Sequence, residues 1–321
     1  MDFDVNARTI LLVKHGSQAY GLATPTSDLD IKGVCIEPKQ YYMGFLNNFE
    51  QHEAMVHKGH PEDKVIYSLK KFMRLAADCN PNIIEVLHVD GSDILSMDET
   101  GERLRGMKDA FLSKKAKHTF SGYAHAQLKR IRSHREWLLN PPKAPPDRKD
   151  FGLSGNRAVS KSDLGAFTEL ERRTVAEFGE VIIDLPTNVV EILVKEKAFA
   201  AAKTTYEQYQ NWVKSRNPAR AVLEAQFGYD TKHGSHLLRL MRMCKEILMG
   251  LGVIVKRPDR EEILDVKMGR RPYDSLIDEA ERLEAECEAL YHTSLLPHSP
   301  DYAWFDAQCV DMIDKYLSKN G

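Results

Sequence analysis

The chain has 321 residues and a mass of 36.6 kDa, enough to bury a substantial core in one large domain or two smaller ones. Its composition is that of an ordinary globular protein, with 42% hydrophobic and 29% charged residues. A formal net charge of −2 argues against a protein that coats nucleic acid through bulk positive charge.

The five cysteines are scattered, and no two have the CxxC spacing typical of metal-thiolate sites. Because an odd number cannot pair fully, disulfides are disfavoured and a reducing compartment is expected. The N-terminus lacks a signal-peptide pattern, and no apolar run approaches the length of a membrane span. We therefore expect a cytoplasmic protein with no membrane partner.

The first elements predicted along the chain are strands. Residues 9–15 (TILLVKH) form an apolar run that ends at Gly16, and residues 29–36 (LDIKGVCI) alternate as a half-buried strand does. Residues 64–67 (KVIY) are a third, shorter candidate. Because side chains repeat every second residue along a strand, Asp28 and Asp30 are expected to share one face.

Helical patterns take over after residue 68. Ser68 is expected to cap a helix that runs to Asp78, and Asn80-Pro81 to open a shorter one. Helix-like spacing then recurs over residues 119–139, 163–178, 187–213, 233–249, 274–291 and 302–318. The predicted fold class is α+β, with a small mixed sheet and helices in an N-terminal domain over residues 1–112 and a helical domain over residues 113–321.

The segment KHGSQAYGLATPTSDLDIK, residues 14–32, carries the strongest chemical signal. Gly16 has no Cβ, so its backbone can approach a phosphate closely, and Ser17 adds a hydroxyl and a backbone N–H. Asp28 and Asp30 are hard oxygen ligands suited to Mg²⁺ or Mn²⁺. A Gly-Ser turn or an Asp-Leu-Asp alone is common in solvated loops, but their combination between two apolar strands predicts a phosphate-and-metal site.

A site for two metal ions normally needs a third carboxylate. Asp63, at the start of the third predicted strand, is the best candidate, and Glu62 is the competing choice. Glu37, Glu50 and Glu53 are further possibilities without a strand context that points them inward. We expect Asp63 also to accept the proton from an incoming hydroxyl.

The motif resembles a known family. A hydrophobic-Gly-Ser triplet, ten residues and then Asp-hydrophobic-Asp are similar to the signature of the DNA polymerase beta superfamily of nucleotidyltransferases. The longer form GSQAYGLATPTSDLDIKGV is closer to the predicted nucleotidyltransferases associated with RNA ligases in RNA repair, which occur in bacteria and phages. Three further segments resemble that branch, namely residues 63–87, 121–131 and 229–240.

This resemblance implies a polymerase-beta-like catalytic domain followed by a helical domain that closes over the nucleotide. It implies that Gly16 and Ser17 bind phosphate. It also implies that Asp28, Asp30 and Asp63 are catalytic and hold Mg²⁺ or Mn²⁺ in a two-ion site. The expected location becomes the cytosol of a bacterium or of a phage-infected host.

A second group of candidates lies late in the chain. On a helix, Lys232, His236 and Arg239 fall at i, i+4 and i+7 and form one basic stripe. Such a stripe, facing the cleft, would neutralise the β- and γ-phosphates of a nucleotide. An ordinary basic surface helix is the alternative. We predict nucleotide binding by these three residues and a structural role for His233.

The acceptor is less constrained than the nucleotide. From Arg105 to Lys149, twelve Lys and Arg stand against three acids, a local excess of +9 that fits either phosphate contact or a solvated helical surface. With the RNA-repair resemblance, this segment makes an RNA 3′ end the leading acceptor.

The predicted reaction moves a nucleoside monophosphate from a nucleoside triphosphate to a hydroxyl and releases pyrophosphate. The alternatives are a protein or small-molecule acceptor, an antitoxin-like modifier of another protein, and a non-catalytic nucleotide or RNA binder.

Overall fold

A computed structural model of the protein describes residues 3–25, 27–56, 62–156, 159–178, 185–216 and 218–320. Contacts divide the chain into two compact units, unit 1 with residues 1–132 and 226–321 and unit 2 with residues 133–225. Unit 1 therefore contains the N-terminal sheet together with helices from the end of the chain. The predicted boundary after residue 112 lies inside unit 1. It concerns where the catalytic domain ends, and it stays a prediction.

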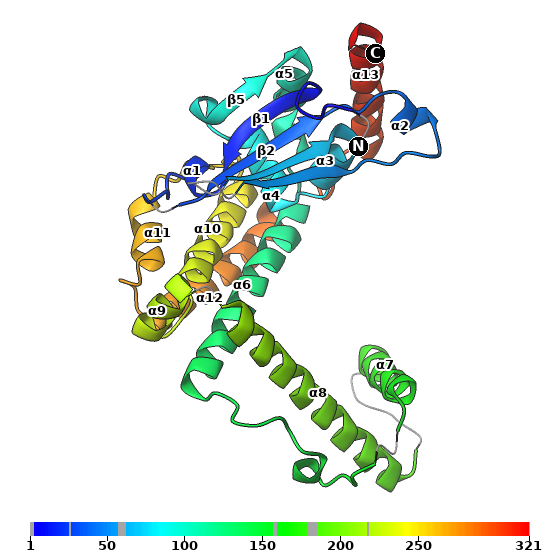
Figure 1. Ribbon diagram of the computed structural model, residues 1–321, viewed down its shortest axis with the longest axis vertical. Helices are drawn as coiled ribbons and strands as arrows, with labels where there is room; N and C mark the ends of the chain where they lie inside the picture. Colours follow the sequence, from blue (N-terminus) through cyan, green and yellow to red (C-terminus); the bar gives the residue numbers. More distant parts are fainter. Residues whose placement is uncertain are drawn as a thin grey trace. The chain divides into compact units, whose positions relative to one another are not determined.

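Unit 1 is built on a five-stranded mixed sheet of order β3-β4-β2-β1-β5 (Figure 1). Its strands are β1 (Thr9–His15), β2 (Leu29–Cys35), β3 (Gln51–Val56), β4 (Glu62–Ser68) and β5 (Ile94–Met97). β2 and β4 run parallel, whereas the other neighbouring pairs are antiparallel. The three predicted strands correspond to β1, β2 and β4.

Short helices follow the strands, and α3 (Leu69–Ala77) and α4 (Pro81–His88) among them pack on the sheet. The others are α1 (Gly16–Ala19), α2 (Gln40–Met43) and α5 (Glu99–Gly106), with short 3-10 turns at Gly91–Asp93 and Lys108–Phe111. Ser68 accepts a hydrogen bond from the backbone N–H of Lys71, and the Asn80 side chain accepts one from that of Asn82, so both predicted caps are present. Fully buried Val34, Phe72 and Ile84 join the sheet to α3 and α4 in one core.

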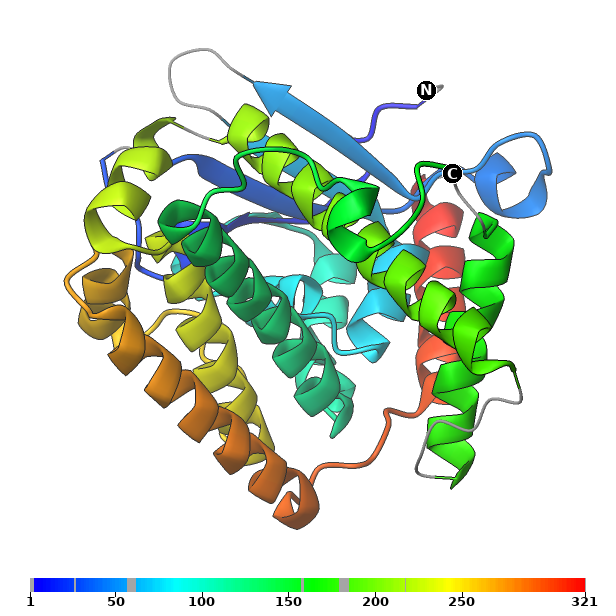
Figure 2. The same ribbon diagram turned by 90° about the horizontal axis from the view of Figure 1, so that it is seen from below.

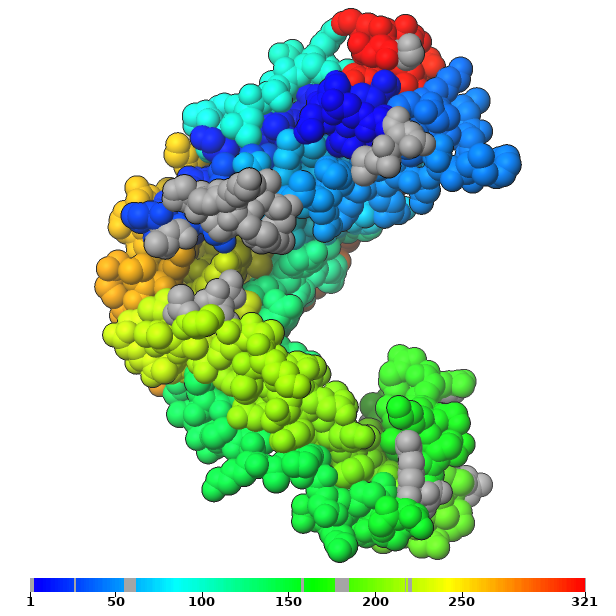
Figure 3. All heavy atoms as spheres, viewed as in Figure 1, coloured from blue at the N-terminus to red at the C-terminus, as the bar shows by residue number. Residues whose placement is uncertain are grey.

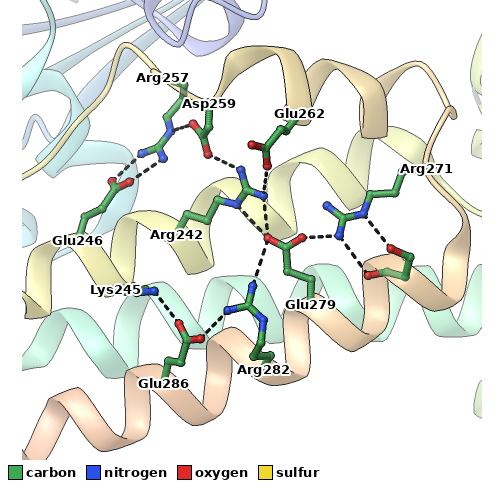
Figure 4. Close-up of polar contacts among 11 residues, drawn as sticks. Arg242, Lys245, Glu246, Arg257, Asp259, Glu262, Arg271, Glu279, Arg282 and Glu286 are labelled. Atoms are coloured by element: carbon green, nitrogen blue, oxygen red, sulfur yellow. Dashed lines mark hydrogen bonds and ion pairs between the residues drawn. The ribbon is translucent and has the colours of Figure 1, made fainter.

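A second helical layer completes unit 1. It contains α6 (Lys115–Leu139, whose last turns belong to unit 2), α10 (Thr231–Leu248), α11 (Arg260–Lys267) and α12 (Tyr273–Thr293). The unit 1 part of α6, α10 and α12 lie side by side (Figure 2), and their facing residues form a second core that includes Leu237, Met241 and Cys244. Between α10 and α12, Arg242 pairs with Glu279 at 2.7 Å (Figure 4).

The last helix returns the chain to the sheet. α13 (Tyr302–Asn320) packs on α3, and Phe305 stacks on Phe111 with their ring centroids 3.9 Å apart. In the space-filling view (Figure 3), α13 in red lies against the blue and cyan N-terminal elements.

Unit 2 is helical. It contains α7 (Lys161–Phe178), α8 (Thr187–Ser215) and most of α9 (Pro218–Phe227). Arg148 pairs with the buried Glu196. Trp137 and Trp212 pack on each other with their ring centroids 5.5 Å apart, so they belong to an aromatic cluster of this region.

These observations confirm the predicted α+β class, a small mixed sheet with helices followed by a helical region. Within the residues that the structure describes, every helix is too short or too polar to span a membrane.

Candidate active site

The pairing of β2 with β4 places two of the predicted carboxylates next to each other. In the parallel register Asp30 is the partner of Asp63, and Leu29 is the partner of Glu62. Since neighbouring residues on a strand point to opposite faces, Asp63 shares the face of Asp30 and Glu62 does not. Asp28 stands two residues before Asp30, and its charge contributes to raising the pKa of Asp30. The three aspartates therefore cluster at one end of the sheet.

The Gly-Ser turn lies against this cluster. β1 ends at His15, which pairs with Asp30, and α1 begins immediately with Gly16 and Ser17. Gly16 has φ +60°, and a Cβ at this position would lie only 1.9 Å from Oδ2 of Asp30. Glycine is therefore required twice here, for the left-handed backbone and for the close approach. The first backbone N–H groups of α1 have no partners within that short helix.

The fold perturbs the pKa of the Asp30 carboxyl group. Burial raises its pKa, Lys232 and Lys32 lower it, and the charges of Asp63 and Asp28 raise it again, with a net increase. Half-buried Asp30 thus feels both like charges and cations, as expected for a site that stabilises positive charge. A divalent cation would relieve the repulsion among the three carboxylates.

Helix α10 supplies Lys232, whose charge acts on Asp30. Lys232 lies in the first turn of α10 and is exposed to solvent. Asp230 caps α10 by accepting a hydrogen bond from the backbone N–H of His233. His236, one turn after Lys232, has a pKa lowered to about 3 by burial and by the charges of Arg239 and Lys232. His236 is therefore neutral at pH 7 and can offer a hydrogen bond to a nucleotide but no charge.

The structure places Arg239 deeper than the other two residues of the stripe. Its side chain is 4% exposed, its guanidinium pairs with Glu85, and it lies 3.8 Å over the centroid of the Tyr20 ring. The same guanidinium donates a hydrogen bond from Nη1 to Sδ of Met243 at 3.3 Å. Arg239 is thus held by protein groups, behind the surface where Lys232 is exposed.

Sequence reasoning missed two residues near the carboxylates, Glu85 and Lys32. Burial would raise the pKa of Glu85, but the charge of Arg239, the contact with His15 and the hydrogen bond from Tyr20 hold it below its usual range. Burial lowers the pKa of Lys32 to about 8, against the charges of Glu85 and Asp30. Lys32 falls two residues after Asp30, so the strand period signals its position; a glutamate on a short helix gives no such signal.

The basic segment that suggested an RNA acceptor is partly balanced by acids from elsewhere in the chain. Lys115 pairs with Asp78 at 3.0 Å, and Arg132 pairs with Glu281 at 3.0 Å. Lys117 pairs with Glu288. Within unit 2, Arg148 pairs with Glu196. Helix α12 therefore supplies much of the negative charge that the local count omitted.

The sheet, the glycine turn and the clustered aspartates are the arrangement expected for a nucleotidyltransferase-like protein. Residues 3–139 match the family model described as "RlaP: RNA repair pathway DNA polymerase beta family". This match agrees with the predicted resemblance to the DNA polymerase beta superfamily, and the matched range contains the turn, all three aspartates and Glu85.

Two further comparisons extend over most of the chain. An uncharacterised 38.9 kDa protein of Enterobacteria phage T4 is 23% identical over 304 residues, covering 88% of this chain and 89% of the phage protein. The crystal structure of a nucleotidyltransferase-like protein from Exiguobacterium sibiricum 255-15 has 13% identity and a TM-score of 0.25, and covers 86% of each chain.

Proposed function

We propose that this protein is a divalent-metal-dependent nucleotidyltransferase that transfers a nucleoside monophosphate from a nucleoside triphosphate to a hydroxyl and releases pyrophosphate. The observation that carries the proposal is the register that pairs Asp30 with Asp63 beside the backbone of Gly16. Carboxylates and a close-approaching backbone are the groups that a metal-bound triphosphate requires.

The donor set fits Mg²⁺ or Mn²⁺. Asp28, Asp30 and Asp63 offer hard oxygen atoms. Burial first, and then the charges of Asp63 and Asp28, raise the pKa of Asp30, and a cation would offset those charges. When bound, such ions would polarise the α-phosphate and stabilise the leaving pyrophosphate. The alternative third ligand, Glu62, points to the other face of β4, which favours Asp63.

The chain's own residues have separable roles in this proposal. The backbone of Gly16 and Ser17 binds the triphosphate, and Lys232 balances its negative charge from α10. His236 contributes a neutral hydrogen-bonding group. Asp63 accepts the proton of the acceptor hydroxyl. Arg239, predicted from its spacing to bind the nucleotide, supports that role only indirectly, because Glu85 and Tyr20 occupy its guanidinium.

An RNA 3′ end is the acceptor that we propose first. The support is the description of the matched family, which names an RNA repair pathway, together with the exposed cations that remain on α6, such as Lys129 and Arg130. A protein side chain or a small molecule is the alternative acceptor, because the fold alone does not select one.

The test is an acceptor screen with the four α-³²P-labelled nucleoside triphosphates, Mg²⁺ or Mn²⁺, and panels of RNA, protein and small-molecule acceptors. We expect metal-dependent labelling of RNA that is lost when the 3′ hydroxyl is blocked. Asp30→Asn is the matched negative control, since it keeps the shape of the side chain and removes its charge. Absence of labelling in every combination, from a folded protein that also binds no triphosphate, would refute the proposal.

A further inference from the structure

A buried carboxylate outside the metal triad connects the two parts of the site. Glu85, on α4, has none of its surface exposed. It accepts hydrogen bonds from the Tyr20 hydroxyl and the Arg239 guanidinium, and its Oε2 lies 3.3 Å from Nε2 of His15. These three partners are each 4% exposed, so the whole group is shielded from water.

The partners of Glu85 come from both sides of the site. His15 and Tyr20 bracket α1, the helix that begins with Gly16 and Ser17. Arg239 lies on α10, seven residues after Lys232. Glu85 thus contacts residues at both ends of α1 and a residue of the helix that carries the exposed lysine.

The buried ion pair between Glu85 and Arg239 holds helix α10 in place at Arg239. At about 1.5 Å per residue, Lys232 stands roughly 10 Å along the α10 axis from Arg239. Because an α-helix is stiff over two turns, the position of Arg239 determines where the lysine stands. Burial excludes competing water, so an ion pair with several hydrogen bonds defines that position more narrowly than apolar packing alone.

We propose that Glu85 is a positioning residue for triphosphate binding. It fixes α10 against the Gly-Ser turn, so that Lys232 faces the same phosphates that the turn binds. Glu85 itself does not touch the nucleotide. This inference rests on the proposed function, because it assigns a role in the binding of its triphosphate substrate.

The experiment must separate positioning from stability, since removing one member of a buried ion pair destabilises a protein. Glu85→Gln leaves Arg239 unpaired, so the informative variant is the double substitution Glu85→Gln with Arg239→Met, which removes both charges and keeps a long side chain. Glu279→Gln is the matched control. It breaks an ion pair of Glu279 with Arg242, which lies on α10 like Arg239, and leaves the contacts of Glu85 in place (Figure 4).

The probes are the four α,β-methylene nucleoside triphosphates with Mg²⁺, measured by isothermal titration calorimetry, and stability is measured by urea unfolding. We expect the double variant to regain most of the stability lost in Glu85→Gln, yet to bind the best analogue at least about tenfold more weakly, because Lys232 is misplaced. Glu279→Gln should lose stability and keep its affinity within about twofold.

Wild-type affinity in a stable double variant would overturn the inference and leave Glu85 a purely structural residue. If the double variant does not fold, Tyr20→Phe decides, since it removes a single hydroxyl from the group. That variant should fold and bind about threefold more weakly; unchanged affinity would again overturn the inference. A wild-type protein that binds none of the four analogues would instead refute the proposed function, and the inference with it.

Discussion

The close approach of Gly16 to Asp30 makes Gly16→Ala a quantitative test of the site. The added Cβ would lie 1.9 Å from Oδ2 of Asp30 and 2.8 Å from Cγ, whereas real Cβ contacts essentially never fall below 3.0 Å. The carboxylate must therefore retreat by about 1 Å, a displacement that costs on the order of 100-fold in rate when it affects a positioned catalytic group. The left-handed backbone adds about 1–2 kcal/mol of strain, which lowers the free energy of unfolding.

Gly21 provides the matched control for this prediction. It also has a left-handed backbone, with φ +71°, but a Cβ there would meet nothing within 4 Å. Both alanine variants should therefore lose about 1–2 kcal/mol in urea unfolding. Only Gly16→Ala should lose nucleotide transfer in an initial-rate assay with Mg²⁺. Equal transfer rates in the two variants would refute the argument that Gly16 makes room for the Asp30 carboxylate.

Three further predictions concern charge. Asp63→Asn should lower the transfer rate by about 10³-fold or more, while Glu62→Gln on the opposite face should change it by no more than about threefold; the reverse result in an initial-rate assay would move the third ligand to Glu62. Lys232→Ala should raise the Michaelis constant for the triphosphate by about tenfold, and an unchanged constant would contradict its role. Burial lowers the pKa of His15 from 6.5 in the unfolded chain to about 4 in the folded protein. Between these values the unfolded chain binds more protons, so lowering the pH from 7 to 5 should cost about 2 kcal/mol of stability at this residue. Urea unfolding at the two pH values measures this loss, and a His15→Gln variant whose pH dependence equals that of the wild type would exclude His15 as its source.

Local signals in the sequence predicted most elements of the fold. Ser68 and Asn80-Pro81 mark helix starts through contacts within three residues, so their caps can be read without the tertiary structure. β3 was missed because its sequence, QHEAMV, is largely polar, as suits an edge strand that pairs only with β4. The boundary between the two compact units has no signal in the sequence, because α6 continues through residue 132 and the helical pattern shows no break there.

The residues of the candidate site could be predicted where spacing along a single strand places them. They were harder to predict where the pairing of two strands decides their positions. The spacing of Asp28 and Asp30 places them on one face, but the choice between Asp63 and Glu62 depends on the register of β4 against β2. Arg239 shares a helix face with Lys232, yet that face passes from solvent into the core along α10, which spacing alone cannot show. Glu85 was missed because only burial distinguishes it from an ordinary surface glutamate.

The Glu85–Arg239 pair also limits when the protein can become active during its own synthesis. The two residues are 154 positions apart in the chain. At about 5–20 residues per second, a ribosome needs roughly 8–30 s to make the intervening segment. Until then the carboxylate has no guanidinium partner and must remain hydrated, because an unpaired buried charge is strongly disfavoured. The N-terminal sheet can therefore form early on the ribosome, but α4 can seat Glu85 only after α10 has emerged, so nascent chains are expected to bind no triphosphate.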